Sequence, residues 1–163
     1  MKKTVLLLLL LCVILVGCDK REYGIMSYQN KNISARCTVN GEYEITLEQE
    51  KGICRLSVTK PERLKGISFE LGTDYSKAVY KGTEITVSRE HLGGICAISN
   101  IFALKEESLT DAMKKGAESV LSFKNIYGTY QVTLGKNSMP QEIIIQSPSY
   151  IYEIRVDAIE IRE

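Results

Sequence analysis

The sequence predicts an α+β domain in which antiparallel strands make up most of the chain. Short runs that alternate apolar and polar residues recur from Asn32 onward, and this period of two is typical of strands with one buried face. Pairs that favour tight turns, such as Asn40-Gly41 and Lys51-Gly52, separate these runs. One stretch, residues 108–121, has the spacing of an amphipathic helix instead.

Hydrophobic matching selects the register of the first hairpin. A two-residue turn at Asn40-Gly41 would place polar side chains opposite apolar ones, whereas a bulged three-residue loop aligns the apolar faces. A slip of one residue moves every side chain to the other face, so the second register is expected. The expected pairs are Val39 with Tyr43, Cys37 with Ile45, and Ala35 with Leu47.

A two-residue turn at Lys51-Gly52 continues this sheet with matching faces. The pairs that it predicts are Leu47 with Leu56, Ile45 with Val58, and Gln49 with Cys54. Cys37 and Cys54 then lie two strands apart, beyond the roughly 7 Å between Cα atoms that a disulfide spans. We therefore expect buried free thiols.

Further strands are expected along the rest of the chain. They comprise residues 66–71, a hairpin at 78–88 with Ile85 and Val87 buried, residues 130–134, 142–146, and a long strand at 150–161. On the long strand, one face should carry Tyr150, Tyr152, Ile154, Val156 and Ala158. Residues 91–100 read as a flexible junction or a short strand.

The predicted helix begins at Ser108, whose hydroxyl can cap it, with Asp111 three residues later. Its apolar stripe would contain Leu109, Ala112, Met113, Gly116, Ala117, Val120 and Leu121. Gly116 would cost this helix about 1 kcal/mol relative to Ala, but on the stripe it would let the helix approach a sheet closely.

The N-terminus has the features of an export signal. Lys2 and Lys3 precede an uncharged run, residues 5–16, which is shorter than the roughly 20 residues that span a bilayer. Gly17 then stands directly before Cys18. This order resembles the lipobox of bacterial lipoproteins, which implies cleavage before Cys18 and attachment of a diacylglycerol to its thiol. An ordinary signal peptide or an uncleaved anchor are the alternatives.

The resemblance implies three parts: a signal peptide at 1–17, a tether or short helix at 18–31, and a β-rich domain at 32–163. The mature protein would be anchored by lipid on the extracytoplasmic face of the cell membrane. Of the five cysteines, Cys12 leaves with the signal and Cys18 carries the lipid. Cys37, Cys54 and Cys96 remain, so at most one intramolecular disulfide could form.

Charge and motif content argue against several functions. The chain has 21 basic and 20 acidic side chains, and so lacks the concentrated positive charge of a nucleic-acid-binding protein. Its single histidine, His91, argues against a multi-histidine zinc site and a Ser/His/Asp triad. A His91 and Cys96 pair would lack an orienting third group. We expect a noncatalytic protein without a metal or cofactor.

The order of elements is similar to the LolA/LolB-like superfamily of lipoprotein carriers. The stretches that carry the resemblance are residues 33–47, 56–61 leading to Gly66, 80–83, 130–134 and 140–145. It implies a strongly curved antiparallel sheet, an incomplete β-barrel covered by one or two helices and enclosing an apolar cavity. The middle stretch also resembles the clostridial germination lipoproteins, which act with a cell-wall amidase.

Two functions are compatible with these expectations. The first is binding of a lipid or other apolar ligand in a half-barrel groove, as the resemblance implies. Its candidate lining residues are Cys37, Ile45, Leu47, Leu56, Val58, Phe69, Met113 and Leu121. These side chains could equally form a closed core with no vacancy. The second function is a protein-interaction scaffold that holds or activates a cell-envelope enzyme, such as a peptidoglycan amidase in germination.

Overall fold

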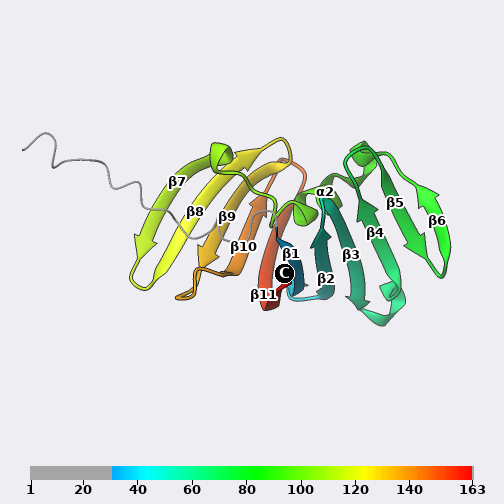
Figure 1. Ribbon diagram of the computed structural model, residues 1–163, viewed down its shortest axis with the longest axis horizontal. Coiled ribbons are helices and arrows are strands. Elements are labelled where there is room, and N and C mark those ends of the chain that lie inside the picture. Colours follow the sequence, from blue (N-terminus) through cyan, green and yellow to red (C-terminus); the bar gives the residue numbers. More distant parts are fainter. Residues whose placement is uncertain (1–30, 163) are drawn as a thin grey trace, which may run out of the picture.

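The computed structural model describes residues 31–162, which form one antiparallel sheet of 11 strands (Figure 1). The predicted signal peptide, Cys18 and all but the last residue of the tether lie outside the described residues. The strands are β1 (Asn32–Val39), β2 (Tyr43–Glu50), β3 (Ile53–Lys60), β4 (Ile67–Leu71), β5 (Ser76–Tyr80), β6 (Thr83–Thr86), β7 (Leu109–Lys115), β8 (Glu118–Asn125), β9 (Gly128–Leu134), β10 (Pro140–Gln146) and β11 (Ile151–Arg162).

The predicted architecture, a large curved and open antiparallel sheet, is confirmed. The strand order is β6-β5-β4-β3-β2-β1-β11-β10-β9-β8-β7, so the first and last strands pair at its centre. Within residues 31–162, β6 and β7 are the two free edges. One α-helix, α2 (Gly93–Ser99), lies in the described chain, together with the 3-10 turns η2 (Glu62–Leu64), η3 (Arg89–Leu92) and η4 (Glu106–Ser108).

Both predicted hairpin registers at the N-terminal end of the domain are confirmed. Val39 pairs with Tyr43 across a three-residue loop, in which Asn40 adopts a φ of 51°. Asn40 also ties this loop to β11, because its amide donates to the Glu153 carbonyl at 2.7 Å and its side-chain oxygen accepts from the Glu153 amide. The pairs across β2 and β3 are Ile45 with Val58, Leu47 with Leu56, and Gln49 with Cys54.

The helix predicted for residues 108–121 is wrong: these residues form the end of η4 and most of the hairpin of β7 and β8. Gly116 has a φ of +66° in the turn. Leu121 and Phe123 point to one side and are almost fully buried, opposite Val132 and Tyr130 of β9. Pairing with β9 thus outweighs a local pattern that fits either a helix or a strand.

Residues 91–100 are neither a flexible junction nor a strand, because they contain α2. Four successive residues of this helix, Cys96, Ala97, Ile98 and Ser99, are buried. The helix is covered on several sides, so it lacks the polar face that would have identified it in the sequence.

Two side chains depart from the predicted pattern, which buries Ile85 and places Ala158 on the same face as Ile154 and Val156. Ile85 is 60% exposed because it lies on β6, an edge strand. Ala158 is exposed because β11 has a bulge. Arg36 pairs with Ala158 and Cys37 with Val156, which leaves Asp157 as the extra residue and reverses the alternation beyond it.

The main core lies between the inner face of the sheet and the segment that contains α2. It combines β1, β2, β3, β8, β9, β10 and β11 with Ala97, Ile98 and the residues directly after the helix. No helix within residues 31–162 is long and apolar enough to cross a membrane. The same part of the chain has no cluster of three potential metal ligands.

Candidate functional site

The inner face of the sheet carries apolar side chains in rows that cross the strands. One row follows the pairing from Leu47 to Leu56, Phe69, Ala78 and Ile85. Leu47 and Leu56 are each only 1% exposed, Phe69 and Ala78 are half-buried, and Ile85 is 60% exposed. The row therefore begins in the core and ends in solvent.

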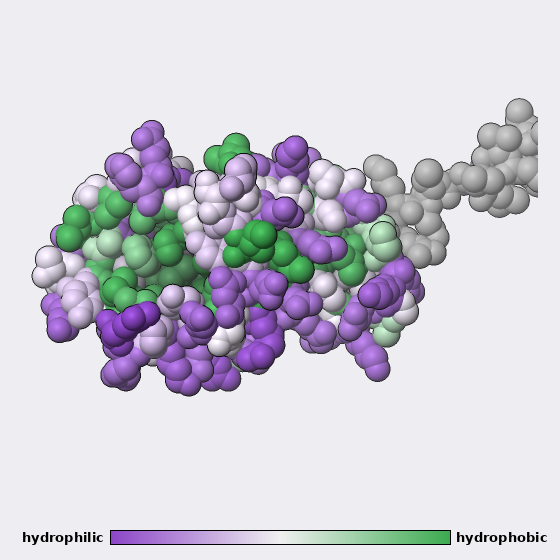
Figure 2. All heavy atoms as spheres, turned by 180° about the vertical axis from the view of Figure 1, so that it is seen from behind, coloured by the Kyte–Doolittle hydropathy of each residue, from purple (hydrophilic) through white to green (hydrophobic). Residues whose placement is uncertain are grey.

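A second row continues the apolar face two residues further along each strand. Ile45 pairs with Val58, and Ile67 pairs with Tyr80, which is 42% exposed. We call the uncovered part of both rows the open inner surface; it consists of Val58, Ile67, Phe69, Ala78, Tyr80 and Ile85. Figure 2 shows apolar side chains gathered in a hollow over the half of the sheet that ends in β6, on the left of that view.

Helix α2 covers only part of the inner face. Three contacts with other parts of the chain hold the helix in place. The Tyr130 hydroxyl donates to the Ala97 carbonyl at 3.1 Å, and the Tyr150 hydroxyl lies 3.4 Å from the Gly93 carbonyl. Gly94 approaches Tyr152 so closely that an added Cβ would clash with the Tyr152 hydroxyl, 2.3 Å away. The helix contacts β3 and β4, whereas the apolar side chains of β5 and β6 extend beyond it.

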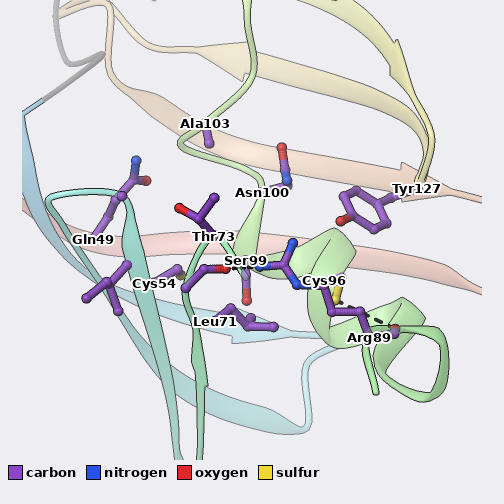
Figure 3. A pocket seen from close by; sticks show the side chains of 13 residues that line it. Gln49, Cys54, Leu71, Thr73, Arg89, Cys96, Ser99, Asn100, Ala103 and Tyr127 are labelled. Atoms are coloured by element: carbon purple, nitrogen blue, oxygen red, sulfur yellow. Dashed lines mark hydrogen bonds between the residues drawn. The ribbon is translucent and has the colours of Figure 1, made fainter. Parts of the chain in front are cut away.

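A separate cavity of about 290 Å³ lies between α2 and the ends of β2, β3 and β4 (Figure 3). Its lining includes the inner-face residues Gln49, Cys54 and Leu71, and Cys96 and Ser99 from α2. Two of its polar atoms, Gln49 Oε1 and Ser99 Oγ, are buried without a nitrogen or oxygen hydrogen-bond partner in the described chain.

Arg89 supplies the positive charge of this cavity. Its side chain is exposed at the rim and donates from Nη2 to the Gly72 carbonyl. In Figure 3 the Arg89 guanidinium points toward Ser99 and Thr73. No carboxylate of residues 31–162 forms an ion pair with it.

The three cysteines of the described chain are free thiols. Burial raises the pKa of the Cys37 thiol to about 12, and the nearby Asp157 carboxylate adds to the rise. Burial likewise raises the pKa of Cys54 to about 11, against a smaller opposing effect of the Ser99 hydroxyl. Cys96, beside Arg89, also has a raised pKa because of burial. All three are therefore protonated near neutral pH and are poor nucleophiles.

The predicted groove residues separate into three groups. Five are buried in the main core: Cys37, Ile45, Leu47, Leu56 and Leu121. Val58 and Phe69 are half-buried and belong to the open inner surface. Met113 is 59% exposed on the edge strand β7, away from the others. Contact of these residues with a ligand stays a prediction.

Sequence reasoning missed the cavity beside α2. A partial signal exists in β2, where Gln49 occupies the same face as Ile45 and Leu47 and so places an amide at an apolar position. Arg89 and Ser99 offered no such signal, because their approach to Gln49 depends on the path of the chain across the sheet.

Comparisons with known proteins support the fold. No family model and no curated protein matches the chain. An uncharacterized conserved protein from Thermus thermophilus superposes with a TM-score of 0.51 at 10% identity, over 85% of this chain and 83% of the other. This similarity shows a shared fold alone.

Two further solved structures are more distant. A putative outer membrane lipoprotein-sorting protein domain from Vibrio parahaemolyticus has a TM-score of 0.45 at 9% identity, over 86% of this chain and 92% of that one. A LolA superfamily protein from Nitrosomonas europaea has a TM-score of 0.42 at 9% identity, over 82% and 85% of the two chains. These similarities do not extend to a ligand or an activity.

Proposed function

We propose that this chain is a noncatalytic, membrane-anchored binding protein that holds a lipid acyl chain or a similar apolar ligand on its open inner surface. The observation that carries the proposal is the apolar row that leaves the core at Leu56 and continues to Ile85, 60% exposed. A contiguous apolar surface in contact with water is characteristic of a binding site.

The composition of this surface fits an acyl chain. All six of its side chains are apolar or aromatic, and they lie on four adjacent strands, β3 to β6. Each methylene that such a chain buries is worth about 0.8 kcal/mol. Contact with several methylenes would therefore give measurable affinity without any directional interaction.

The sequence of the first 18 residues supports the location. The charged start, the short apolar run and the Gly17-Cys18 pair together predict lipid attachment at Cys18. A diacylglycerol would hold the domain at the extracytoplasmic face of a membrane, where lipid ligands are available.

Ligand binding can be tested with a protein that comprises residues 19–163. Organic extraction followed by mass spectrometry should recover lipid, and a fluorescent acyl probe should bind saturably. Ile85→Glu should weaken probe binding several-fold because it places a charge on the apolar row. Ile151→Glu is the matched control, since Ile151 is 58% exposed at the start of β11.

Protein that yields no lipid and takes up no probe would reject the carrier proposal and leave the scaffold function as the alternative. The anchor needs its own test: Cys18→Ala should release the protein from membranes washed with carbonate. Retention of that variant would contradict lipid attachment.

A further inference from the structure

The cavity beside α2 combines groups that an apolar ligand would leave unsatisfied. Ser99 is only 8% exposed, and its hydroxyl has no nitrogen or oxygen hydrogen-bond partner in the described chain. Its one hydrogen bond is with the Cys54 thiol, which is a weak donor and a weak acceptor. Gln49 Oε1 also lacks a donor within residues 31–162. Buried polar atoms without partners cost free energy, so a molecule that supplies a donor for Gln49 and a partner for Ser99 is favoured here.

The charge of the residues that line the cavity limits which class of molecule can bind there. Arg89 is the one charged side chain among the lining residues of the cavity. One of its nitrogens donates to the Gly72 carbonyl, which leaves further N–H groups of the guanidinium to bind an acceptor. A single guanidinium matches the geometry of a carboxylate, and it disfavours a ligand with net positive charge.

The rest of the lining is suited to a short apolar group. Ile53, Leu71, Ala103 and the Tyr127 ring contribute to the wall beside the polar atoms. The volume, about 290 Å³, lies at the lower end of the range for small-molecule sites. A compact ligand with a polar end and a small apolar end is therefore indicated.

We propose that this cavity binds a small organic carboxylate with an adjacent amine or hydroxyl group and a short apolar side chain. The carboxylate contacts the Arg89 guanidinium, and the adjacent group donates to Gln49 Oε1. Ser99 lines the same cavity as Arg89 and is the further polar group available to the ligand's head group. The site goes beyond the proposed acyl binding, because none of the open inner surface lines this cavity.

Equilibrium dialysis of the full-length protein in lipid nanodiscs, with empty nanodiscs as the blank, tests the proposal. The probes are radiolabelled L-leucine and L-leucate, which distinguish an amine from a hydroxyl at the same position. At least one should bind saturably. 4-Methylpentanoate, which lacks the donor, and leucine methyl ester, which lacks the carboxylate, should each compete about tenfold less well.

Variants connect binding to the cavity. Arg89→Gln should weaken binding of the preferred probe about tenfold, and Thr73→Glu should weaken it by placing a negative charge at the exposed rim. Arg63→Gln, at an exposed arginine of η2, is the matched control and should bind as the wild type does. Thermal unfolding of each variant separates lost binding from lost folding.

Three results would overturn the proposal: no saturable binding of either probe, equal competition by the ester, or wild-type affinity in both Arg89→Gln and Thr73→Glu. The first means that the cavity holds water only. The acyl probe, measured on the same variants, keeps the two functions apart. Arg89→Gln should bind it normally, so either function can fail while the other stands.

Discussion

The Tyr130 hydroxyl on β9 donates a hydrogen bond to the Ala97 carbonyl of α2, with 3.1 Å between the two oxygens. Both residues are completely buried, and they are 33 positions apart in the sequence. This contact ties α2 to β9, in the half of the sheet that ends in β7. The position of the helix in turn determines which part of the inner face is covered and which part stays open.

Removal of this hydroxyl by Tyr130→Phe should lower the free energy of unfolding by about 1 kcal/mol, because one buried hydrogen bond is lost. The Ala97 carbonyl keeps the Asn100 amide as a donor at 3.2 Å, so no buried acceptor is left unpaired. Urea denaturation measures the change. Tyr80→Phe is the control, since Tyr80 lies on an open part of the sheet and is 42% exposed. Equal stability of the two variants would show that the hydrogen bond does not hold α2.

Gly94 should be needed for close packing of α2 against β11. Ala is better than Gly by up to about 1 kcal/mol in a helix, but at Gly94 its methyl group would lie 2.3 Å from the Tyr152 hydroxyl. We expect Gly94→Ala to destabilise the protein by about 1–3 kcal/mol. Gly93→Ala meets open space and should be neutral or stabilising. Tyr152→Leu should relieve the cost of Gly94→Ala in a double-mutant cycle.

Gly116→Ala distinguishes the observed hairpin from the helix that the sequence suggested. In the turn between β7 and β8 the φ of Gly116 is +66°, which costs an alanine about 1–2 kcal/mol. In a helix the same change would stabilise by about 1 kcal/mol. The sign of the change in the midpoint of thermal unfolding therefore decides between the two, and a stabilised variant would contradict the hairpin.

The buried thiols should make stability fall at alkaline pH. Folding raises the pKa of Cys37 to about 12 and that of Cys54 to about 11, from an ordinary value of 9.0. Because the folded state favours the protonated thiol, its stabilisation is complete below pH 9 and is lost as pH rises toward these folded values.

Unfolding in urea at about pH 8 and about pH 10 measures this loss. The decrease in stability should be smaller in Cys37→Ala and Cys54→Ala than in the wild type, although each variant starts from a lower stability because it leaves a cavity. An unchanged pH dependence in both variants would refute the assignment to these thiols.

The bulge at Asp157 should make part of the stability sensitive to acid. Its carboxylate accepts from the Thr38 hydroxyl at 2.6 Å and from Arg155 Nε at 2.8 Å, and these groups hold the pKa of Asp157 below its usual value. This stabilisation is present above the usual pKa of an aspartate and is lost as pH falls below it. Wild type should exceed Asp157→Asn in stability at about pH 6, and the difference should shrink by about pH 2.5. A constant difference would exclude the carboxylate charge as its cause.

Residues 32–60 show what alternation of apolar and polar residues determines by itself. Only one register puts Ile45 opposite Cys37 and Leu47 opposite Ala35, and the structure has that register. Side chains of a hairpin meet their partners within a few residues, so local pattern and turn type are sufficient there. The separation of Cys37 from Cys54 follows from the same pairing.

Tertiary structure decided the features that depend on distant partners. Residues 109–125 became strands because β8 pairs with β9, and Gly93–Ser99 became a helix because the inner face of the sheet covers it. The bulge at Asp157 changed the phase of β11, which no period of two can reveal. The open inner surface and the Arg89 cavity likewise arise where chain segments meet. A sequence pattern indicates which face of a strand is apolar, but it does not indicate which segment packs against that face.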